Sequence, residues 1–201
     1  MTLSKRLFDL FSALGMIILL SPVFLYLCLM ILIKDGRPIF YVSERMKTPT
    51  KGFNLIKFRT MKPVAEDSGV SGGDKSSRIT HTGAFLRRTR LDELPQVINV
   101  LKGDISFVGP RPPLRQYVEQ YPEIYGKVLK SRPGVTGMAS IYFNAHEERL
   151  LSRCRNREET DRVYRRICIP RKARLDLLYQ KRNNVCFDMD LMLRSVFKRM
   201  R

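Results

Sequence analysis

The chain has 201 residues, of which 37 are Lys or Arg and 19 are Asp or Glu, so its formal charge is +18. This length is enough for one domain with a hydrophobic core, and an apolar fraction of 44% argues against intrinsic disorder. The positive charge predicts a polyanionic partner, namely nucleic acid, acidic lipid or a phosphorylated substrate, and composition does not distinguish these three.

The first predicted element is an uncharged apolar run over residues 10–33. A helix of that length is about 36 Å long, enough to cross a bilayer core of about 30 Å. Ser21 and Pro22 lie in its middle, so we expect a kink, with the Ser21 hydroxyl bonded to a carbonyl that the proline frees. Basic residues flank both ends, which places both on the cytoplasmic side. A kinked transmembrane helix and a re-entrant helix that returns to its starting face both remain open.

Two segments rich in aromatic and branched residues, 38–42 and 53–58, predict a β-hairpin. Alternation along the second strand places Lys57 and Arg59 on one face, either as a solvated edge or as a phosphate site. Residues 62–83, rich in Gly, Ser and Asp, predict a long loop.

The next block predicts an amphipathic helix, because apolar residues recur there at helical spacing. Asp92 is the expected N-cap, Glu93 lies in the first turn, and Lys102 and Gly103 end the helix. By themselves, a capping Asp and a first-turn Glu require no further function.

Arginines on both sides of this acidic pair point to a second interpretation. Arg87 precedes the pair, and Arg111 follows it among three prolines at 110–113. A rigidly held guanidinium suits the capture of phosphate oxygens, and adjacent carboxylates can bind Mg²⁺ together with a substrate phosphate. The pattern indicates phosphoryl transfer, although a salt-bridge network would use the same residue types. The Gly/Pro-rich segment 131–138 is either an anion cradle or a turn.

The last predicted helix, over 189–200, has an apolar face with basic residues beside it. Such a helix either lies in a membrane interface or packs against the core. The four cysteines are scattered without a metal-binding or disulfide spacing. They therefore predict thiols that are not paired, in a reducing compartment.

With these residues in view, the sequence resembles the bacterial sugar transferase family, the monotopic phosphoglycosyl transferases that act on polyprenyl phosphate. The resemblance covers most of the chain. It rests on Ser21-Pro22 in the N-terminal helix, KFRTM at 57–61, LRRTRLDELPQ at 86–96, NVLKGDISFVGPRP at 99–112 and RPGVTG at 132–137.

The resemblance implies an α+β, mainly helical fold in two parts. Residues 1–36 are expected to form a re-entrant membrane helix kinked at Ser21-Pro22. Residues 37–201 are expected to form a cytoplasmic domain with a β-hairpin and interfacial amphipathic helices. The implied location is the cytoplasmic face of the bacterial inner membrane.

The resemblance also implies a reaction. A sugar-1-phosphate passes from a UDP-sugar to undecaprenyl phosphate and UMP is released, the first membrane step of glycoconjugate assembly. Asp92 is the implied nucleophile, forming a covalent aspartyl-phosphosugar with ping-pong kinetics. Glu93 is its partner, Mg²⁺ is the cofactor, and both carboxylates are expected to hold the metal. Basic residues expected around the phosphates are Lys57, Arg87 and Arg111 from the resemblance, and Arg59 from its place beside Lys57.

Residues 138–149 depart from the family pattern, which often continues with Gln and an Asn-Gly-Arg turn, so no contact is transferred to them. The alternative function is a membrane-tethered basic module that binds anionic lipid or nucleic acid without catalysis. That alternative explains the charge but not the LDELPQ and GPRP motifs. As a transferase, the protein would have a UDP-sugar, undecaprenyl phosphate and membrane lipids as partners, without nucleic acid. The sugar and the oligomeric state are not predicted.

Overall fold

The computed structural model describes residues 1–64 and 73–197. The strands are β1 (Phe40–Met46), β2 (Gly52–Phe58), β3 (Ser106–Val108) and β4 (Gly134–Thr136). The α-helices are α1 (Leu3–Lys34), α2 (His81–Thr89), α3 (Gln96–Lys102), α4 (Arg115–Gln120), α5 (Pro122–Val128), α6 (Met138–Leu151), α7 (Arg157–Val163), α8 (Ile169–Arg182) and α9 (Val185–Phe197). Two 3₁₀ turns, η1 (Gly73–Arg78) and η2 (Leu91–Glu93), and a π turn, η3 (Tyr164–Cys168), complete the described part. The predicted mainly helical fold with a β-hairpin is confirmed.

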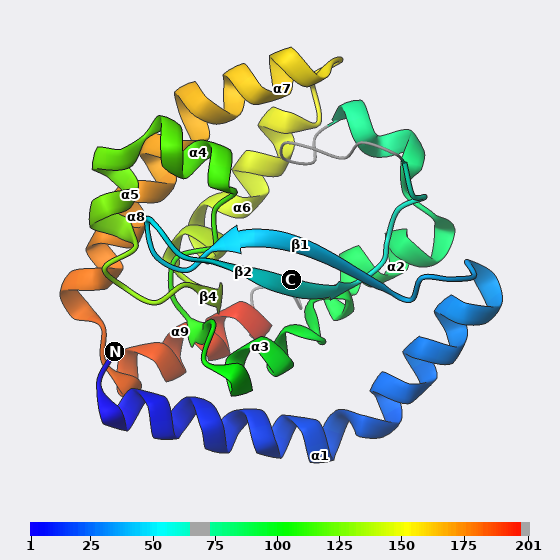
Figure 1. The fold of residues 1–201 in the computed structure, drawn as a ribbon, viewed down its shortest axis with the longest axis horizontal. Helices are drawn as coiled ribbons and strands as arrows, with labels where there is room; N and C mark the ends of the chain where they lie inside the picture. The colour runs from blue at the N-terminus through cyan, green and yellow to red at the C-terminus, as the bar shows by residue number, and fades with distance from the viewer. Residues whose placement is uncertain (65–72, 198–201) are drawn as a thin grey trace.

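The apolar helix α1 runs along one edge of the molecule and changes direction partway along its length (Figure 1). Pro22 lies inside it, and Ser21 Oγ donates a hydrogen bond of 3.0 Å to the carbonyl of Ile18. This is the carbonyl that the proline, having no N–H, leaves without its helical partner. The helix has a mean hydropathy of 2.8 in its most apolar window, 11% of which is buried. By length and composition alone, it could cross a membrane.

The first turns of α1 are bonded to the rest of the molecule by Lys5. Its Nζ donates to the Val108 carbonyl and to the Tyr179 hydroxyl, each at 3.0 Å, and forms an ion pair with Asp188. All of these groups are buried, so the ammonium is held by β3, α8 and α9 at once.

The other end of α1 is held by Arg59. Its guanidinium donates to the carbonyls of Pro38 (2.6 Å), Asp35 (2.7 Å) and Gly36 (2.7 Å), directly after the helix. The Thr80 hydroxyl donates to Asp35 Oδ2 at 3.0 Å. Both ends of α1 therefore dock on the same body of the protein.

The hairpin pairs β1 and β2 in antiparallel register, from Phe40 opposite Phe58 to Met46 opposite Gly52. Asn99 joins this hairpin to α3. Its Oδ1 accepts from the Ile56 amide at 3.0 Å and its Nδ2 donates to the Asn54 carbonyl at 2.8 Å. This amide clamp holds β2 and α3 together.

The helix expected to begin at Asp92 begins at Gln96, so that prediction is wrong. Asp92 and Glu93 lie in η2, directly after Arg90, which ends α2 with a left-handed φ of 57°. Pro95 has no N–H with which to continue the 3₁₀ turn, so α3 starts only after it. The predicted end is confirmed, because α3 stops at Lys102 with Gly103 at a φ of 75°. Helix α2 itself begins inside the expected loop.

The two Gly/Pro-rich motifs lie side by side as the short parallel pair β3–β4. The Gly134 amide donates to the Pro110 carbonyl at 2.8 Å, and the Gly109 amide to the Thr136 carbonyl at 2.9 Å. A Cβ on Gly134 would lie 2.2 Å from the Gly109 nitrogen. Close backbone approach therefore explains these glycines, and the Gly134 amide is not available for the anion cradle considered for 131–138.

Three apolar clusters fill the interior. They centre on Tyr117, Val128 and Ile169 between α4, α5 and α8, on Val100, Ile105 and Leu191 between α3, β3 and α9, and on Leu27, Ile31, Phe58 and Leu86 beneath the second half of α1. The four cysteines, all within the described residues, form no disulfide, as predicted.

The apolar face predicted for the last helix is divided. Met192 packs on the core beside the buried Leu191, whereas Met189 and Leu193 are exposed. The side chains of residues 196–201 lie outside the described part. Contact of α9 with a membrane interface stays a prediction, as does the domain boundary at residue 36.

Candidate active site

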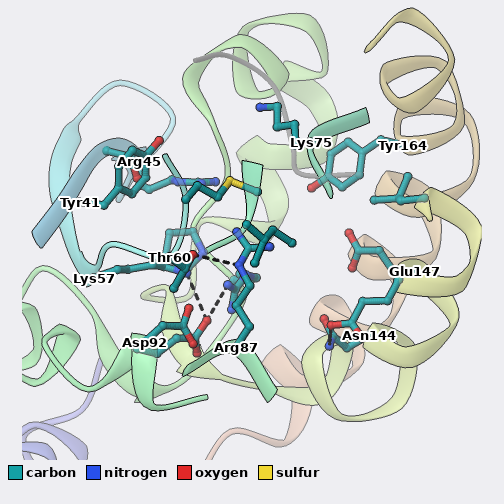
Figure 2. Close-up of a pocket in the computed structure, with 18 of the residues that line it drawn as sticks. Tyr41, Arg45, Lys57, Thr60, Lys75, Arg87, Asp92, Asn144, Glu147 and Tyr164 are labelled. Atoms are coloured by element: carbon teal, nitrogen blue, oxygen red, sulfur yellow. Dashed lines mark hydrogen bonds and ion pairs between the residues drawn. The ribbon is translucent and has the colours of Figure 1, made fainter. Parts of the chain in front are cut away.

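A cavity of about 950 Å³ lies between the hairpin, η2, the loop after β3, and helices α6 and α8. It is lined by all the residues proposed from the sequence for chemistry or phosphate binding: Lys57, Arg59, Arg87, Asp92, Glu93 and Arg111. Figure 2 shows Lys57, Arg87 and Asp92 on one side of this space. The structure thus brings these residues together, and their roles stay predictions.

Glu93 holds two cations of the cavity. Its Oε1 accepts from Arg111 Nη2 at 2.7 Å and from Lys57 Nζ at 3.2 Å. Burial alone would raise the pKa of Glu93, but the charges of Arg111 and Lys57 outweigh it and hold the pKa well below its usual range. In return, the Glu93 charge raises the pKa of Arg111. Burial lowers the pKa of Lys57 to about 8, although Glu93 opposes this.

Asp92 differs from its neighbour because it has no such partner. Its side chain is 9% exposed, and Oδ1 is buried without a hydrogen bond from any residue of the described part. Burial raises the pKa of Asp92, with Lys57 opposing this and Glu93 adding to it. A buried acceptor without a donor is costly in a protein interior. Because Asp92 lines the cavity, a bound ligand is what could supply the missing partner. We call Lys57, Asp92, Glu93 and Arg111 the dyad corner.

The Arg111 loop is held as rigidly as its prolines suggested. The Pro110 carbonyl accepts from Gly134, and the Pro113 carbonyl accepts from the Met46 amide at 2.9 Å. The guanidinium is therefore presented to the cavity from a backbone fixed on both sides.

The two other arginines proposed from the sequence, Arg87 and Arg59, have different contacts. Arg87 Nε donates to Thr60 Oγ1 at 2.9 Å, and Figure 2 shows its side chain beside Asp92. Arg59 lines the same cavity, but its Nε and Nη2 are taken up by the carbonyls after α1. Its contacts are those of a structural clamp and differ from those expected of a phosphate ligand.

Within residues 1–64 and 73–197, no group of three or more His, Cys, Asp or Glu side chains could hold a metal ion. The dyad corner nonetheless fits Mg²⁺, because Asp92 Oδ1 is an oxygen without a partner. Mg²⁺ in phosphoryl-transfer sites is bound by one or two carboxylates plus substrate phosphates and waters. Glu93 contributes less easily, since two cations occupy its Oε1.

The opposite side of the cavity was not predicted from the sequence. Asn144 and Glu147 project into it from α6, across from Asp92 (Figure 2). Lys172 and Asp176 line it from α8, and Lys172 Nζ lies 2.9 Å from Glu147 Oε1. We call these four residues the α6–α8 wall. The signals available in the sequence were the helical spacings of the two pairs and the unusual composition of 138–149.

Comparison with known proteins identifies the family of this chain. A family model described as bacterial sugar transferase matches residues 1–201. The uncharacterized sugar transferase EpsL of Bacillus subtilis (strain 168) is 41% identical over 137 residues, covering 68% of this chain and 67% of that protein. The UDP-glucose:undecaprenyl-phosphate glucose-1-phosphate transferase of Escherichia coli (strain K12) is 36% identical over 200 residues, covering 98% of this chain.

A third relative, the putative undecaprenyl-phosphate N-acetylgalactosaminyl 1-phosphate transferase of Bacillus subtilis (strain 168), is 42% identical over 118 residues, covering 58% of this chain and 66% of that protein. The chain spans 40% of the length of the Escherichia coli relative. The match over all described elements, with the acidic pair and its arginines in one cavity, shows that this chain belongs to the bacterial sugar transferase family.

Proposed function

We propose that this protein transfers a sugar-1-phosphate from a UDP-sugar to undecaprenyl phosphate, releasing UMP, as the first membrane step of glycoconjugate assembly. The observation that carries the proposal is the buried, unpartnered Oδ1 of Asp92 beside cations that Glu93 already holds in place. The names of two relatives, which specify undecaprenyl-phosphate sugar-1-phosphate transferases, support the same reaction class.

In the first step, a carboxylate oxygen of Asp92 attacks the phosphorus that carries the sugar. A new P–O bond forms, the P–O bond to UMP breaks, and its electron pair leaves with UMP. An ionised carboxylate needs no base for this attack. Its difficulty is the approach to an anionic diphosphate, and Lys57, Arg87 and Arg111 relieve it by neutralising charge.

In the second step, an oxygen of the lipid phosphate attacks the acyl phosphate. The P–O bond to Asp92 breaks, the carboxylate is regenerated, and the sugar diphosphate lipid is formed. Glu93 is a weak proton acceptor, because its two cations hold its pKa low. Its contacts favour another role, which is to fix Arg111 and Lys57 around the transferred phosphoryl group.

Mg²⁺ fits the dyad corner, with Asp92 as the better placed ligand and Glu93 as the second. When bound there with the substrate, it would supply further neutralisation of the diphosphate charge. Loss of UMP release on chelation, restored by added Mg²⁺ but not by Na⁺, is the expected result.

We propose that α1 is re-entrant and that the protein is monotopic at the cytoplasmic face of the bacterial inner membrane. The support is that Lys5 and Arg59 tie the two ends of α1 to the same body. Many apolar side chains between them are exposed, including Phe11, Ile18 and Leu25. Docking of both ends on one body favours a helix that leaves both ends on the same face of a bilayer.

The non-enzymatic alternative, a basic module that binds anionic lipid or nucleic acid, explains none of the geometry around Asp92. Family membership also favours the enzyme. Salt-sensitive binding of nucleic acid without any phosphosugar transfer would revive this alternative.

The reaction is tested with detergent-solubilised protein, undecaprenyl phosphate and a panel of UDP-sugars, measuring UMP and lipid product. Without the lipid, the intact mass is expected to increase by one phosphosugar. The Asp92→Asn variant is expected to lose both signals, and the matched control Asp190→Asn, in an exposed pair with Arg194, to keep them. No UMP from any sugar would overturn the proposed reaction, and full turnover by Asp92→Asn would overturn the nucleophile.

Topology is tested by thiol labelling in sealed vesicles, after Cys186→Ser removes the exposed native cysteine. Ser4→Cys and Lys51→Cys place exposed thiols in the first turn of α1 and in the hairpin turn. Labelling of both from the same face is expected, and labelling from opposite faces would exclude re-entry.

A further inference from the structure

The α6–α8 wall is a buried group of charges that the mechanism above does not use. Glu147 and Lys172 form an ion pair whose side chains are 13% and 14% exposed. Lys172 Nζ also reaches the hydroxyl of Tyr164 at 3.4 Å. Asp176, one helical turn after Lys172, is 6% exposed and accepts no hydrogen bond from a described residue. The four side chains of the wall and that of Tyr164 all line the cavity.

This arrangement does not serve stability. Buried ion pairs contribute little compared with apolar residues of similar size, and an acid buried without a donor costs free energy. Burial raises the pKa of Asp176 to about 7, against the opposing charge of Lys172 and with the help of Glu147. A cost of this kind inside a substrate cavity indicates a functional group.

The wall and the dyad corner act on the same occupant. The charge of Glu147 contributes to the raised pKa of Arg111, which places the two sides within electrostatic reach. Each side has two acids, but the corner holds two cations and the wall holds one, which is paired with Glu147, so the phosphates lie toward Lys57 and Arg111. The part of the ligand against the wall is then the uncharged part.

A UDP-sugar offers three uncharged parts: the uracil, the ribose with its two free hydroxyls, and the transferred sugar, which carries more hydroxyls than the ribose. Uracil presents two carbonyl oxygens and one N–H, so its recognition calls mainly for donors. Sugar hydroxyls can donate to carboxylates and accept from an ammonium or an amide. Glu147 and Asp176 supply acceptors, while Lys172 and Asn144 supply donors, which matches a polyhydroxylated ring.

We propose that Asn144, Glu147, Lys172 and Asp176 bind the hydroxyl groups of the transferred sugar and determine which nucleotide sugar is used. This inference rests on the proposed function. The substrate class is a UDP-hexose with free hydroxyls on the ring edge away from its phosphate. A site built to bond a hydroxyl rejects sugars that lack it or orient it differently, because its buried groups are then left unpaired.

The test measures affinities and kcat/KM for UDP-glucose, UDP-galactose, UDP-N-acetylglucosamine and UDP alone. The variants are Asp176→Asn and Glu147→Gln. Matched controls carry the same substitutions in exposed pairs, Asp190→Asn and Glu44→Gln. Asp176→Asn removes a buried charge and no hydrogen bond, so it is expected to fold even where Glu147→Gln does not.

Both variants are expected to change the ratios between sugars by about 10-fold or more, with the affinity for UDP within about 3-fold of wild type, a change of less than 1 kcal/mol. Unchanged ratios would overturn the inference. An equal loss for UDP would also overturn it, since the wall would then bind the nucleoside. If wild type turns over no sugar while Asp176→Asn still shifts the binding ratios, the proposed function fails and the sugar site stands. Absence of wild-type binding to every probe would overturn both.

Discussion

The dyad corner and the α6–α8 wall face each other across one cavity, but they balance charge in opposite ways. In the corner, one carboxylate, Glu93, binds two cations and leaves Asp92 without a partner. In the wall, one cation, Lys172, lies beside two acids. The first arrangement suits an anion that brings its own charge, and the second suits a neutral group that brings hydroxyls. The proposed orientation of the substrate in this cavity rests on that asymmetry.

The largest expected effect tests whether Asp92 alone does the chemistry. Asp92→Asn is expected to lower kcat by at least about 10³-fold for every sugar, because the nucleophile is lost. The affinity for UDP is expected to hold or to rise, since a negative charge near the diphosphate is removed. Single-turnover rates and UDP titration measure the two effects. If the loss of rate in Asp92→Asn depended on the sugar, the corner would also contribute to sugar selection, which contradicts the proposed division of roles between corner and wall.

The next effect compares one substitution at both sites. Glu93→Gln is expected to reduce kcat/KM by about 10²-fold and by the same factor for all sugars, because Arg111 and Lys57 lose their charged partner. Glu147→Gln is expected to act unequally on different sugars. Parallel kinetics on the UDP-sugar panel, with Glu44→Gln as control, provide the comparison. If both variants changed kcat/KM in the same proportions across the sugars, the corner and the wall would not have the separate roles proposed here.

A smaller effect concerns stability and pH. The pKa of Asp176 is raised from 3.8 to about 7, so the folded state binds its proton more tightly than the unfolded state does. Stability is therefore lost as pH rises from about 4 to about 7, and the loss is complete above that range. Asp176→Asn is expected to increase the free energy of unfolding at pH 8 by about 1–3 kcal/mol, with little change near pH 4.

Urea unfolding in detergent at both pH values checks this prediction, with Asp190→Asn as the exposed control. A variant less stable than wild type at pH 8 would show that Asp176 is a structural acid.

The smallest effect concerns Glu148, which links Arg90, next to the dyad corner, to Asn144 of the wall. Glu148 on α6 accepts from Arg90 Nη2 at 2.9 Å and from Asn144 Nδ2 at 2.8 Å. The Glu148 and Arg90 side chains are 66% and 37% exposed, and exposed pairs contribute about 0–1 kcal/mol. Glu148→Gln is expected to change kcat/KM by less than about 3-fold, or 0.7 kcal/mol. A larger loss in steady-state assays would mean that α6 positions η2 through Arg90.

The residues of the dyad corner could be predicted because most of their determinants are close to them in the sequence. Asp92 and Glu93 are adjacent, and prolines restrain Arg111 through covalent geometry. The bond from Ser21 to Ile18 follows in the same way from Pro22. For such residues, a short stretch of sequence contains most of the determinants.

What was missed depends on distant contacts. Nothing in the sequence signals a left-handed Arg90, since this conformation is rare for Arg, and it separates α2 from the turn that holds Asp92 and Glu93. Strand alternation placed Arg59 on the same face as Lys57. It could not show that the carbonyls after α1 would accept the hydrogen bonds of the Arg59 guanidinium. The short β3–β4 pair has no periodicity to detect. The wall required the packing of α6 on α8, which joins residues 25 apart.

The bonds of Lys5 also set an order of assembly. Its partners Val108, Tyr179 and Asp188 are 103, 174 and 183 residues further along the chain. During synthesis α1 exists long before they do, so a helix that inserts as proposed would reach the bilayer while its ammonium is still hydrated. Closing so long a loop is slow and entropically costly. If α1 is the membrane helix proposed above, it is inserted first and fixed last, and α9 then helps to set how α1 lies in the lipid.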